Sequence, residues 1–557
     1  MRALANVYSS FLDLIENTRW GTAGFRLARF GLFAMVIFVG SRIASRRFLS
    51  FDFSDILFMA ITALAFLVIY ARWEIGIAAV LATTSFIAYY DVMPTLSLYH
   101  FIPEIPILED LRLMVGQGIM LFMLAAFATS TEVRTAHRRL STPLTPVLLL
   151  FLLAIFIAAM VGIVFNGVFL SMMVDTARPY SFYLMFFVGL LCLRNRRAMN
   201  TLLAILLVMA TIVALLMFVQ FAAGDHFKVF LGKSVRVEVF GGYAGRILPP
   251  GTELIWMTVP FVISRIPISS AGTQRVLISL LAMLLGGLLL TFTRSVWMGT
   301  LFSMVIMAVL GRGAVRRGVL RMFLALGIFV AVLLVFLQLV STTEENYMTP
   351  YVKRFTSIFD PESYEEGSSA DARRQEIKAA WPKIVENPWF GVGVGGTYNY
   401  VEAWDEGGQR HFMRPVSYIH NAYFLLLTHT GFVGFSTCMC MYLTFFMRAR
   451  KIFRRLRRPD DRAVVMAAIG AIASVMLASI MQPSLWYPPA VPCIGLIFAL
   501  VELVRYFSDM ENGEAGPWRG ALRTASAALV QPLRPGANPA AAYRGARALV
   551  PRAHRPL

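Results

Sequence analysis

Long apolar runs separated by short polar stretches make up most of this chain of 557 residues. Many of the runs approach the roughly 20 residues with which an α-helix crosses a bilayer. The pattern therefore predicts an all-α polytopic membrane protein with about 12–14 transmembrane helices. The predicted spans are 27–44, 55–71, 75–93, 111–130, 145–167, 179–193, 199–223, 251–265, 275–292, 295–311, 319–341, 418–446, 463–481 and 489–506.

Two longer polar segments interrupt the pattern. Residues 224–251 form the shorter one, and residues 342–417 form a loop much longer than a usual connection between helices. The chain then divides into a cytoplasmic N-terminus (1–26), a first group of transmembrane helices (27–341), an extracytoplasmic loop (342–417), C-terminal transmembrane helices (418–506) and a basic cytoplasmic tail expected to be disordered (507–557).

The long loop is predicted to contain a helix of its own. Ser369 or Asp371 can cap its start, and the pair Asn387-Pro388 ends it. Apolar side chains recur between these limits at helical spacing, at Ile377, Trp381 and Ile384. This apolar stripe would lie on the membrane surface or cover a cavity between the helices.

Composition fits the membrane class, and charge orients the chain. Hydrophobic residues make up 58%, the mean hydropathy is +0.66, and only 15% are charged, against about 25% in soluble proteins. The net charge of +19 gathers in runs that face the cytoplasm by the positive-inside rule: 194–197, 311–321, 448–458 and the tail after 506. Only the basic segment 41–48 would lie outside. Topology and anionic headgroups explain this charge, so we predict membrane lipids and no nucleic acid as partners.

The sequence contains no pattern typical of a metal or nucleotide site. Walker, HExxH and DxD patterns do not stand out. The run GVGVGG (391–396) has no preceding strand, so we interpret it as tight turns close to a ligand or a helix. Four cysteines fall within predicted spans, where they are expected to pack without a disulfide or a metal: Cys192, Cys438, Cys440 and Cys493. We therefore predict no cofactor and no metal.

The most informative stretch reads HNAYFLLLTHTGFVG and begins at His420, where a polar segment meets an apolar one. Burying a polar ring in hydrocarbon is costly unless the ring has a partner or a wet cavity. At the outer end of a helix, a neutral imidazole can accept a proton from a hydroxyl. The alternative is a histidine that is only hydrogen-bonded at an interface.

Three arginines at the predicted outer face are candidates for binding phosphate. Arg294 lies between two apolar runs in TFTRSVWMG, and a guanidinium binds phosphate oxygens in a bidentate fork. Arg236 and Arg246 lie in the shorter polar segment, and either could supply a second cation for a diphosphate. The alternatives are a membrane anchor at Arg294 and solvated loop charges at the other two.

Carboxylates are plentiful in the long loop, but their spacing pairs none of them. A glycosidase-like pair is therefore unsupported, and most are expected to be solvated. They are Glu344, Glu345, Asp360, Glu362, Glu365, Glu366, Glu376 and Glu386.

Taken together, three stretches resemble the O-antigen ligase / O-antigen polymerase superfamily, which also includes protein O-oligosaccharyltransferases. TFTRSVWMG resembles the family's Thr/Ser-x-Ser/Thr-Arg helix start. Residues 373–398 (RRQEIKAAWPKIVENPWFGVGVGGTY) resemble its loop helix followed by Asn-Pro-x-x-Gly-x-Gly. The segment His420-Asn421-x9-Gly431-x-x-Gly434 matches the ligase-associated signature. The likeness covers residues 251–440, and the N-terminal half only as a run of helices.

The resemblance implies a glycosyltransferase of the bacterial inner membrane whose active site faces the periplasm. The donor would be a glycan on undecaprenyl diphosphate, and a hydroxyl of a glycolipid, a glycan or a protein would attack its anomeric carbon without metal or ATP. His420 would activate the hydroxyl, while Arg294, with Arg246 or Arg236, would hold the diphosphate. Further candidates in the matched motifs are Arg374 and Asn421.

Two positions depart from the family pattern. Arg246 lies in GRILPPG, without the Asn-Pro-Asn often found just afterwards, which keeps Arg236 as an alternative. His429 stands where relatives often carry an acidic residue, and we interpret it as structural.

A polysaccharide flippase or transporter is the alternative from a different class. Such proteins usually have short loops and polar residues at mid-membrane. This chain instead gathers its polar residues at the outer face beneath a long loop, which favours the transferase. Within the transferase class, the sequence leaves open a ligase, an O-antigen or exopolysaccharide polymerase and a protein O-oligosaccharyltransferase.

Overall fold

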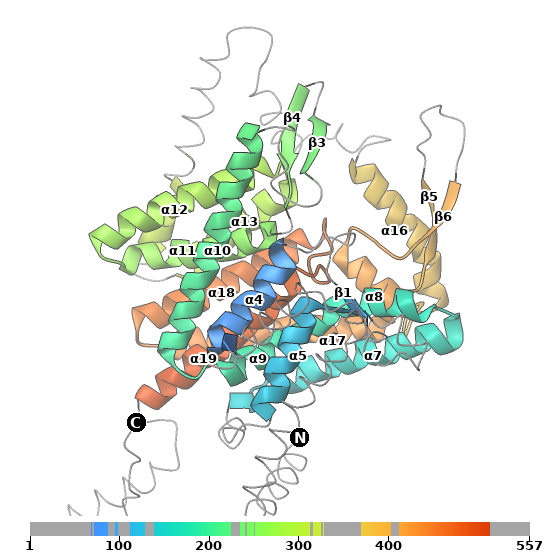
Figure 1. Cartoon of the computed structure of the whole chain (residues 1–557), viewed down its shortest axis with the longest axis horizontal. Helices are drawn as coiled ribbons and strands as arrows, with labels where there is room; N and C mark the ends of the chain where they lie inside the picture. Colours follow the sequence, from blue (N-terminus) through green and yellow to red (C-terminus); the bar gives the residue numbers. More distant parts are fainter. Residues whose placement is uncertain are drawn as a thin grey trace, which may run out of the picture. The chain divides into compact units, whose positions relative to one another are not determined.

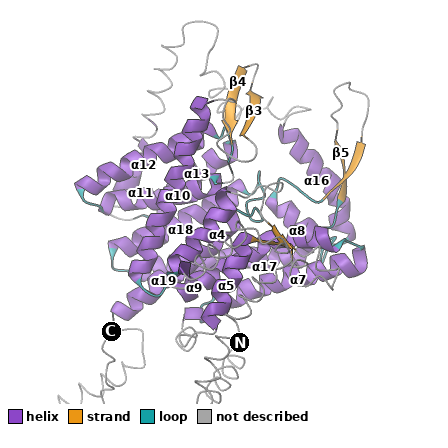
Figure 2. Cartoon of the chain, in the orientation of Figure 1, coloured by secondary structure: helices purple, strands orange, loops and turns teal. Residues whose placement is uncertain are grey.

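The computed structural model is built almost entirely of helices (Figures 1 and 2). It describes residues 68–69, 72–86, 95–97, 112–128, 139–223, 234–239, 242–249, 251–311, 316–324, 327, 369–402 and 412–512. Several predicted segments lie outside these ranges, wholly or in large part. They are the N-terminus (1–26), the span 27–44, the basic segment 41–48, the tail from residue 513 to 557, and much of the spans 55–71 and 319–341. The prediction of an all-α polytopic membrane protein is confirmed.

Six helices in the described ranges are long and apolar enough to cross a membrane. They are α7 (Leu144–Asn166), α10 (Arg196–Ala223), α12 (Ala271–Leu290), α17 (Ala422–Arg455), α18 (Pro459–Ala478) and α19 (Ala490–Glu511). Shorter helices are α4 (Trp73–Phe86), α5 (Val115–Ala128), α8 (Leu170–Ser181), α9 (Met185–Cys192), α11 (Thr252–Arg265), α13 (Arg294–Leu310) and α16 (Ser369–Glu386).

Residues from Leu503 onward form a second compact unit, which is described as far as Asn512. Within it, Arg505 Nε lies 3.2 Å from Asp509 Oδ2.

One predicted span is wrong. Residues 179–193 do not form a single helix, because α8 continues to Ser181, a 3-10 turn follows at Phe182–Leu184, and α9 begins at Met185. Pro179 lies in the last turn of α8, where its ring removes a backbone donor and disfavours a longer helix. The predicted span joined the polar end of α8 to the apolar residues of the 3-10 turn and α9.

Three short antiparallel pairs of strands, which the sequence did not predict, lie in the connections (Figure 2). They are β1 (Thr95–Ser97) with β2 (Arg112–Met114), β3 (Ser234–Val239) with β4 (Gly242–Ile247), and β5 (Tyr398–Glu402) with β6 (Phe412–Val416). The long loop thus contains the predicted helix, α16, and also the β5–β6 ribbon beside it (Figure 1). The helix begins at Ser369 and ends before Asn387, as predicted.

Ion pairs join the start of α18 to two other helices. Asp461 pairs with Arg196 at the start of α10, and Asp460 Oδ1 lies 2.9 Å from an Nη of Arg265 in the last turn of α11. The starts of α10 and α18 and the end of α11 therefore meet. This is also the end at which the basic run 194–197 lies.

The opposite end of α18 meets the starts of α13 and α17. The backbone N–H of Ala422 donates to the carbonyl of Ser479 at 2.9 Å, and the side-chain amide of Gln482 donates to Ser295 Oγ at 2.6 Å. Because α13 and α17 begin here, the basic residues that follow them lie toward the other end. Charge is thus segregated along the bundle in the way that the positive-inside rule requires.

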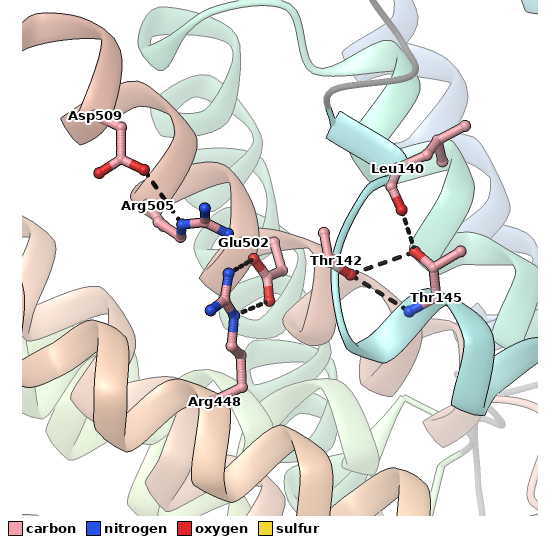
Figure 3. A network of polar contacts seen from close by, with 7 residues as sticks. All are labelled: Leu140, Thr142, Thr145, Arg448, Glu502, Arg505 and Asp509. Atoms are coloured by element: carbon pink, nitrogen blue, oxygen red, sulfur yellow. Dashed lines mark hydrogen bonds and ion pairs between the residues drawn. The ribbon is translucent and has the colours of Figure 1, made fainter. Parts of the chain in front are cut away.

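A buried ion pair joins α17 to the first part of α19 (Figure 3). Arg448 donates from Nε to one carboxylate oxygen of Glu502 at 2.8 Å and from an Nη to the other at 3.2 Å, and both side chains are largely buried. A second network in the same view fixes the start of α7, where Thr145 Oγ1 donates to the carbonyl of Leu140 at 2.6 Å. Polar groups inside the bundle are therefore paired at these points, as low polarity requires.

Candidate functional site

His420 lies immediately before α17 because the next residue caps that helix. The side-chain oxygen of Asn421 accepts hydrogen bonds from the backbone N–H groups of Tyr423 at 2.9 Å and Phe424 at 3.2 Å. These bonds satisfy two of the donors that a helix start leaves unpaired. The structure therefore places Asn421 as an N-cap that fixes where the chain enters α17, and so where His420 stands.

Replacing Asn421 by Ala is expected to destabilise the protein by about 1 kcal/mol, the usual effect of losing an N-cap oxygen. Asn421→Asp is the matched control, since a carboxylate oxygen can accept the same two bonds. Thermal unfolding of the detergent-solubilised protein measures both. Equal melting temperatures for the Ala and Asp variants would show that the cap contributes little.

The strongest partner of His420 is Glu376 on α16, 44 residues earlier in the chain. One carboxylate oxygen lies 2.7 Å from the His420 ring Nδ1, and the other accepts the His420 backbone N–H at 3.0 Å. Glu376 is 8% exposed, so it is an exception to the expectation that most carboxylates of the loop are solvated. Its burial could have been predicted from its helical spacing with Ala380 and Ile384, which lie on the same buried face of α16.

The same face of α16 brings Arg373 toward Arg294. An Nη of Arg373 lies 3.8 Å from the sulfur of Met481, and the adjacent Gln482 binds Ser295, next to Arg294. Burial lowers the pKa of Arg373, the neighbouring Glu376 and Tyr418 raise this pKa, and the positive charge of Arg294 lowers it. Two guanidinium groups and one carboxylate thus interact electrostatically in one place.

The candidate Arg374 is exposed on α16, whereas its neighbour Arg373 is half-buried. Of the predicted apolar stripe, Ile384 lies on the buried face of α16, where it is 8% exposed. Trp381 is 52% exposed, although its ring lies at 6.4 Å from that of Phe424. A helical period defines which residues share a face, but it does not decide which face the rest of the protein covers.

Aromatic rings line the approach to His420. The Tyr418 ring meets the His420 ring edge-on at 4.9 Å and the Trp486 ring at 6.0 Å. The hydroxyl of Tyr398, at the start of β5, donates to the backbone carbonyl of Tyr418 at 2.9 Å. The segment before α17 is therefore held between the loop and the turn that follows α18.

Arg236 and Arg246 both lie on the β3–β4 ribbon. Arg236 is paired with Gly245 and Arg246 with Val235, and successive pairs of an antiparallel ribbon belong to opposite faces. The backbone register therefore gives the two positions to different faces. Their side chains lie outside the described part of the structure, so both stay candidates on sequence grounds.

The glycines of the second and third motifs meet in one contact, between the turn after α16 and the break in α17 at Gly431. Gly431 has φ 59° and ψ −162°, which interrupts α17 and leaves nearby backbone groups without helical partners. The turn after α16 supplies those partners. The carbonyl of Thr428 accepts from Val392, and the N–H groups of Phe432 and Val433 donate to the carbonyls of Pro388 and Trp389.

This contact leaves no room for a side chain at either glycine. A Cβ at Gly391 would lie 2.2 Å from the carbonyl oxygen of Thr428, and one at Gly431 would lie 2.4 Å from the carbonyl carbon of Trp389. Gly391, Gly393 and Gly395 have positive φ, which confirms the tight turns, and they pack against helices. The Gly-x-Gly run thus anchors α16 to α17 and helps to bring Glu376 to His420.

Other polar side chains are also buried in the bundle. His429 is fully buried in α17, which fits the structural role assigned to it. Glu253 is buried in the first turn of α11. Within the described ranges, no group of three or more His, Cys, Asp or Glu residues could hold a metal ion, and the four cysteines, all of them described, form no disulfide.

The fold and the site define a polytopic α-helical membrane protein with a charged cluster at one end of its helices. Residues 278–439 match the family model described as O-antigen ligase. The matched range contains all three motifs, so the resemblance to the O-antigen ligase superfamily is confirmed. The match indicates a membrane glycosyltransferase of the O-antigen ligase type. None of the curated proteins matches the chain in sequence.

Proposed function

We propose that this protein transfers a glycan from undecaprenyl diphosphate to an acceptor hydroxyl at the outer face of the inner membrane, as an O-antigen ligase. The observation that carries the proposal is the convergence of the three family motifs. The start of α13, the buried face of α16 and the residue before α17 meet around Arg294, Glu376 and His420.

In this proposal His420 activates the acceptor. Its side chain is 44% exposed, so a hydroxyl can approach the ring. With Nδ1 directed at Glu376, the second ring nitrogen, Nε2, is the one available to take the hydroxyl proton. The hydroxyl oxygen then forms a bond to the anomeric carbon, the bond from that carbon to the phosphate oxygen breaks, and the lipid diphosphate departs with the electron pair.

The departing diphosphate needs cations, and the structure offers two. Arg294 lies close enough to Arg373 to lower the pKa of Arg373, and a guanidinium binds phosphate oxygens in a bidentate fork. A diphosphate between them would offset their mutual repulsion and would be stabilised as its charge grows. Arg373 thus joins Arg294, while Arg236 and Arg246 on the β3–β4 ribbon stay further candidates. Because the glycosyl diphosphate carries the energy, neither ATP nor a metal is required.

The position of the cluster supports an outward-facing site. The cluster lies at the end of α18 opposite its ion pairs with Arg196 and Arg265. Basic residues mark the cytoplasmic end of a helical membrane protein. The opposite end is then the periplasmic one, where a lipid-linked glycan and its acceptor would meet.

Deleting the gene is expected to leave finished polymer on the lipid carrier and to remove it from its acceptor. The measurement is profiling of surface and carrier-linked glycans in the deletion strain, with and without a plasmid copy of the wild-type gene. Single repeats on the surface would instead identify a polymerase. Loss of glycan from proteins alone would identify an oligosaccharyltransferase. Glycan trapped on the cytoplasmic side of the membrane would favour a flippase and contradict the proposal.

A further inference from the structure

We infer that Glu376 is the residue that orients His420 and fixes which ring nitrogen acts as the base. The inference rests on the proposed function, in which His420 accepts the proton of the acceptor. Glu376 itself touches no substrate in this account, so its role is that of a positioning residue. None of the three family motifs, as they stand in the sequence, assigned a role to this carboxylate.

The geometry shows both oxygens of Glu376 bound to the same residue. One oxygen holds the backbone N–H of His420 at 3.0 Å, and the other lies 2.7 Å from Nδ1 of its ring. The backbone contact fixes the position of the residue, and the ring contact fixes the rotation of the side chain. The edge of Tyr418 packs against the same ring at 4.9 Å.

These contacts also determine the tautomer. An ionised carboxylate can only accept hydrogen bonds, so Nδ1 must carry the hydrogen that lies between it and Glu376. In the neutral ring, Nε2 then has a free lone pair and can act as a base. When Nε2 takes up a proton, the positive ring remains beside a negative carboxylate, which stabilises the charged intermediate state.

An amide at position 376 cannot replace the carboxylate. His420 presents two donors, its backbone N–H and its Nδ1–H, and Glu376 has one acceptor oxygen for each. A glutamine offers one oxygen and one NH₂ group. If the oxygen accepts the backbone N–H, the NH₂ group faces Nδ1 and forces the hydrogen onto Nε2, which removes the base.

Other charged and titratable groups near the ring are few in the part of the chain that the structure describes. Arg373 comes from the same helix as Glu376, Tyr418 from the segment of His420 itself, and Arg294 from the start of α13. Only Glu376 among these is anionic at neutral pH. Its removal would leave the positive ring that forms during the reaction without a neighbouring carboxylate.

The test compares full-length variants in membranes of the deletion strain, which supply both the accumulated lipid-linked glycan and the acceptor. Glu376→Gln is expected to lower the transfer rate roughly 10²–10⁴-fold, the usual effect of losing a general base, with little change in the KM for the donor. A fall in kcat at an unchanged KM separates the loss of an oriented base from a loss of donor binding. Glu386→Gln is the matched control on α16, since Glu386 is exposed and pairs only at the surface with Lys383, and it should behave as wild type.

A wild-type rate for Glu376→Gln would overturn the inference. If His420→Ala is inactive in the same membranes, the proposed function survives that result, whereas an active His420→Ala would remove the proposed mechanism itself. Should Glu376→Gln fail to insert, Glu376→Asp decides the question. The aspartate side chain is shorter by one methylene, so its carboxylate lies farther from His420. A rate lowered at least about tenfold with normal insertion would support the inference. Unchanged kinetics would contradict it.

Discussion

His420→Ala is expected to abolish glycan transfer while the protein still inserts into the membrane at wild-type levels. Removing a general base typically lowers the rate roughly 10²–10⁴-fold. Insertion should be unaffected, because His420 precedes α17 and its side chain is 44% exposed, while Asn421 still caps the helix. The measurement is the surface glycan profile of the deletion strain carrying the variant, with the protein quantified by immunoblot.

Two further variants separate chemistry from structure at this position. His420→Gln keeps a donor that can reach Glu376 but has no group that can accept a proton at neutral pH, so it should be as inactive as the alanine variant. Cys440→Ala changes an exposed position on the same helix and should retain full activity. A normal glycan profile with His420→Ala would contradict the proposal that His420 acts as the general base.

Arg294→Lys is expected to lower transfer strongly although it keeps the positive charge. An ammonium is a point charge and cannot bind two phosphate oxygens in one plane, as a guanidinium does. The loss of one donor that stabilises developing negative charge lowers the rate roughly 10²–10³-fold. Initial rates at saturating donor, measured in membranes, test this result.

Arg275→Lys is the control for Arg294→Lys, because Arg275 is an exposed residue of α12 away from the cluster. Full activity of both lysine variants would favour the interpretation of Arg294 as a membrane anchor. A loss confined to Arg294→Lys, together with a higher KM for the donor in Arg373→Lys, would support the proposed pair of phosphate-binding arginines. Arg374→Lys, on the exposed face of α16, should leave the KM unchanged.

The local features of the site could be predicted because they depend on neighbours in the sequence. The limits of α16 follow from Ser369 and from the pair Asn387-Pro388, and both agree with the structure. The start of α17 follows from the capping oxygen of Asn421. The sequence also indicated turns at residues 391–396, where positive φ angles occur.

The break in α17 is different, because it depends on two distant segments. The glycine at position 431 has a physical reason only when the turn after α16 is placed against it, where the backbone of Trp389 approaches. The spacing between His420 and Gly431 therefore records the length of helix between the site and the anchoring contact. The spacing can be read from the sequence, but the contact that requires it is seen only in the structure.

By itself, the sequence determined the class of the protein, most of its long helices, the segregation of its basic charge and the two residues around which the proposed chemistry is built, His420 and Arg294. These properties follow from hydropathy, capping and motif spacing, which act over short stretches of chain. Only the tertiary structure showed that Glu376 contacts His420 and that Arg373 is half-buried, whereas Arg374 and Trp381 are exposed. The reason is that a helix presents several faces of similar composition, and the face that becomes buried is selected by packing against parts of the chain 44 or more residues away.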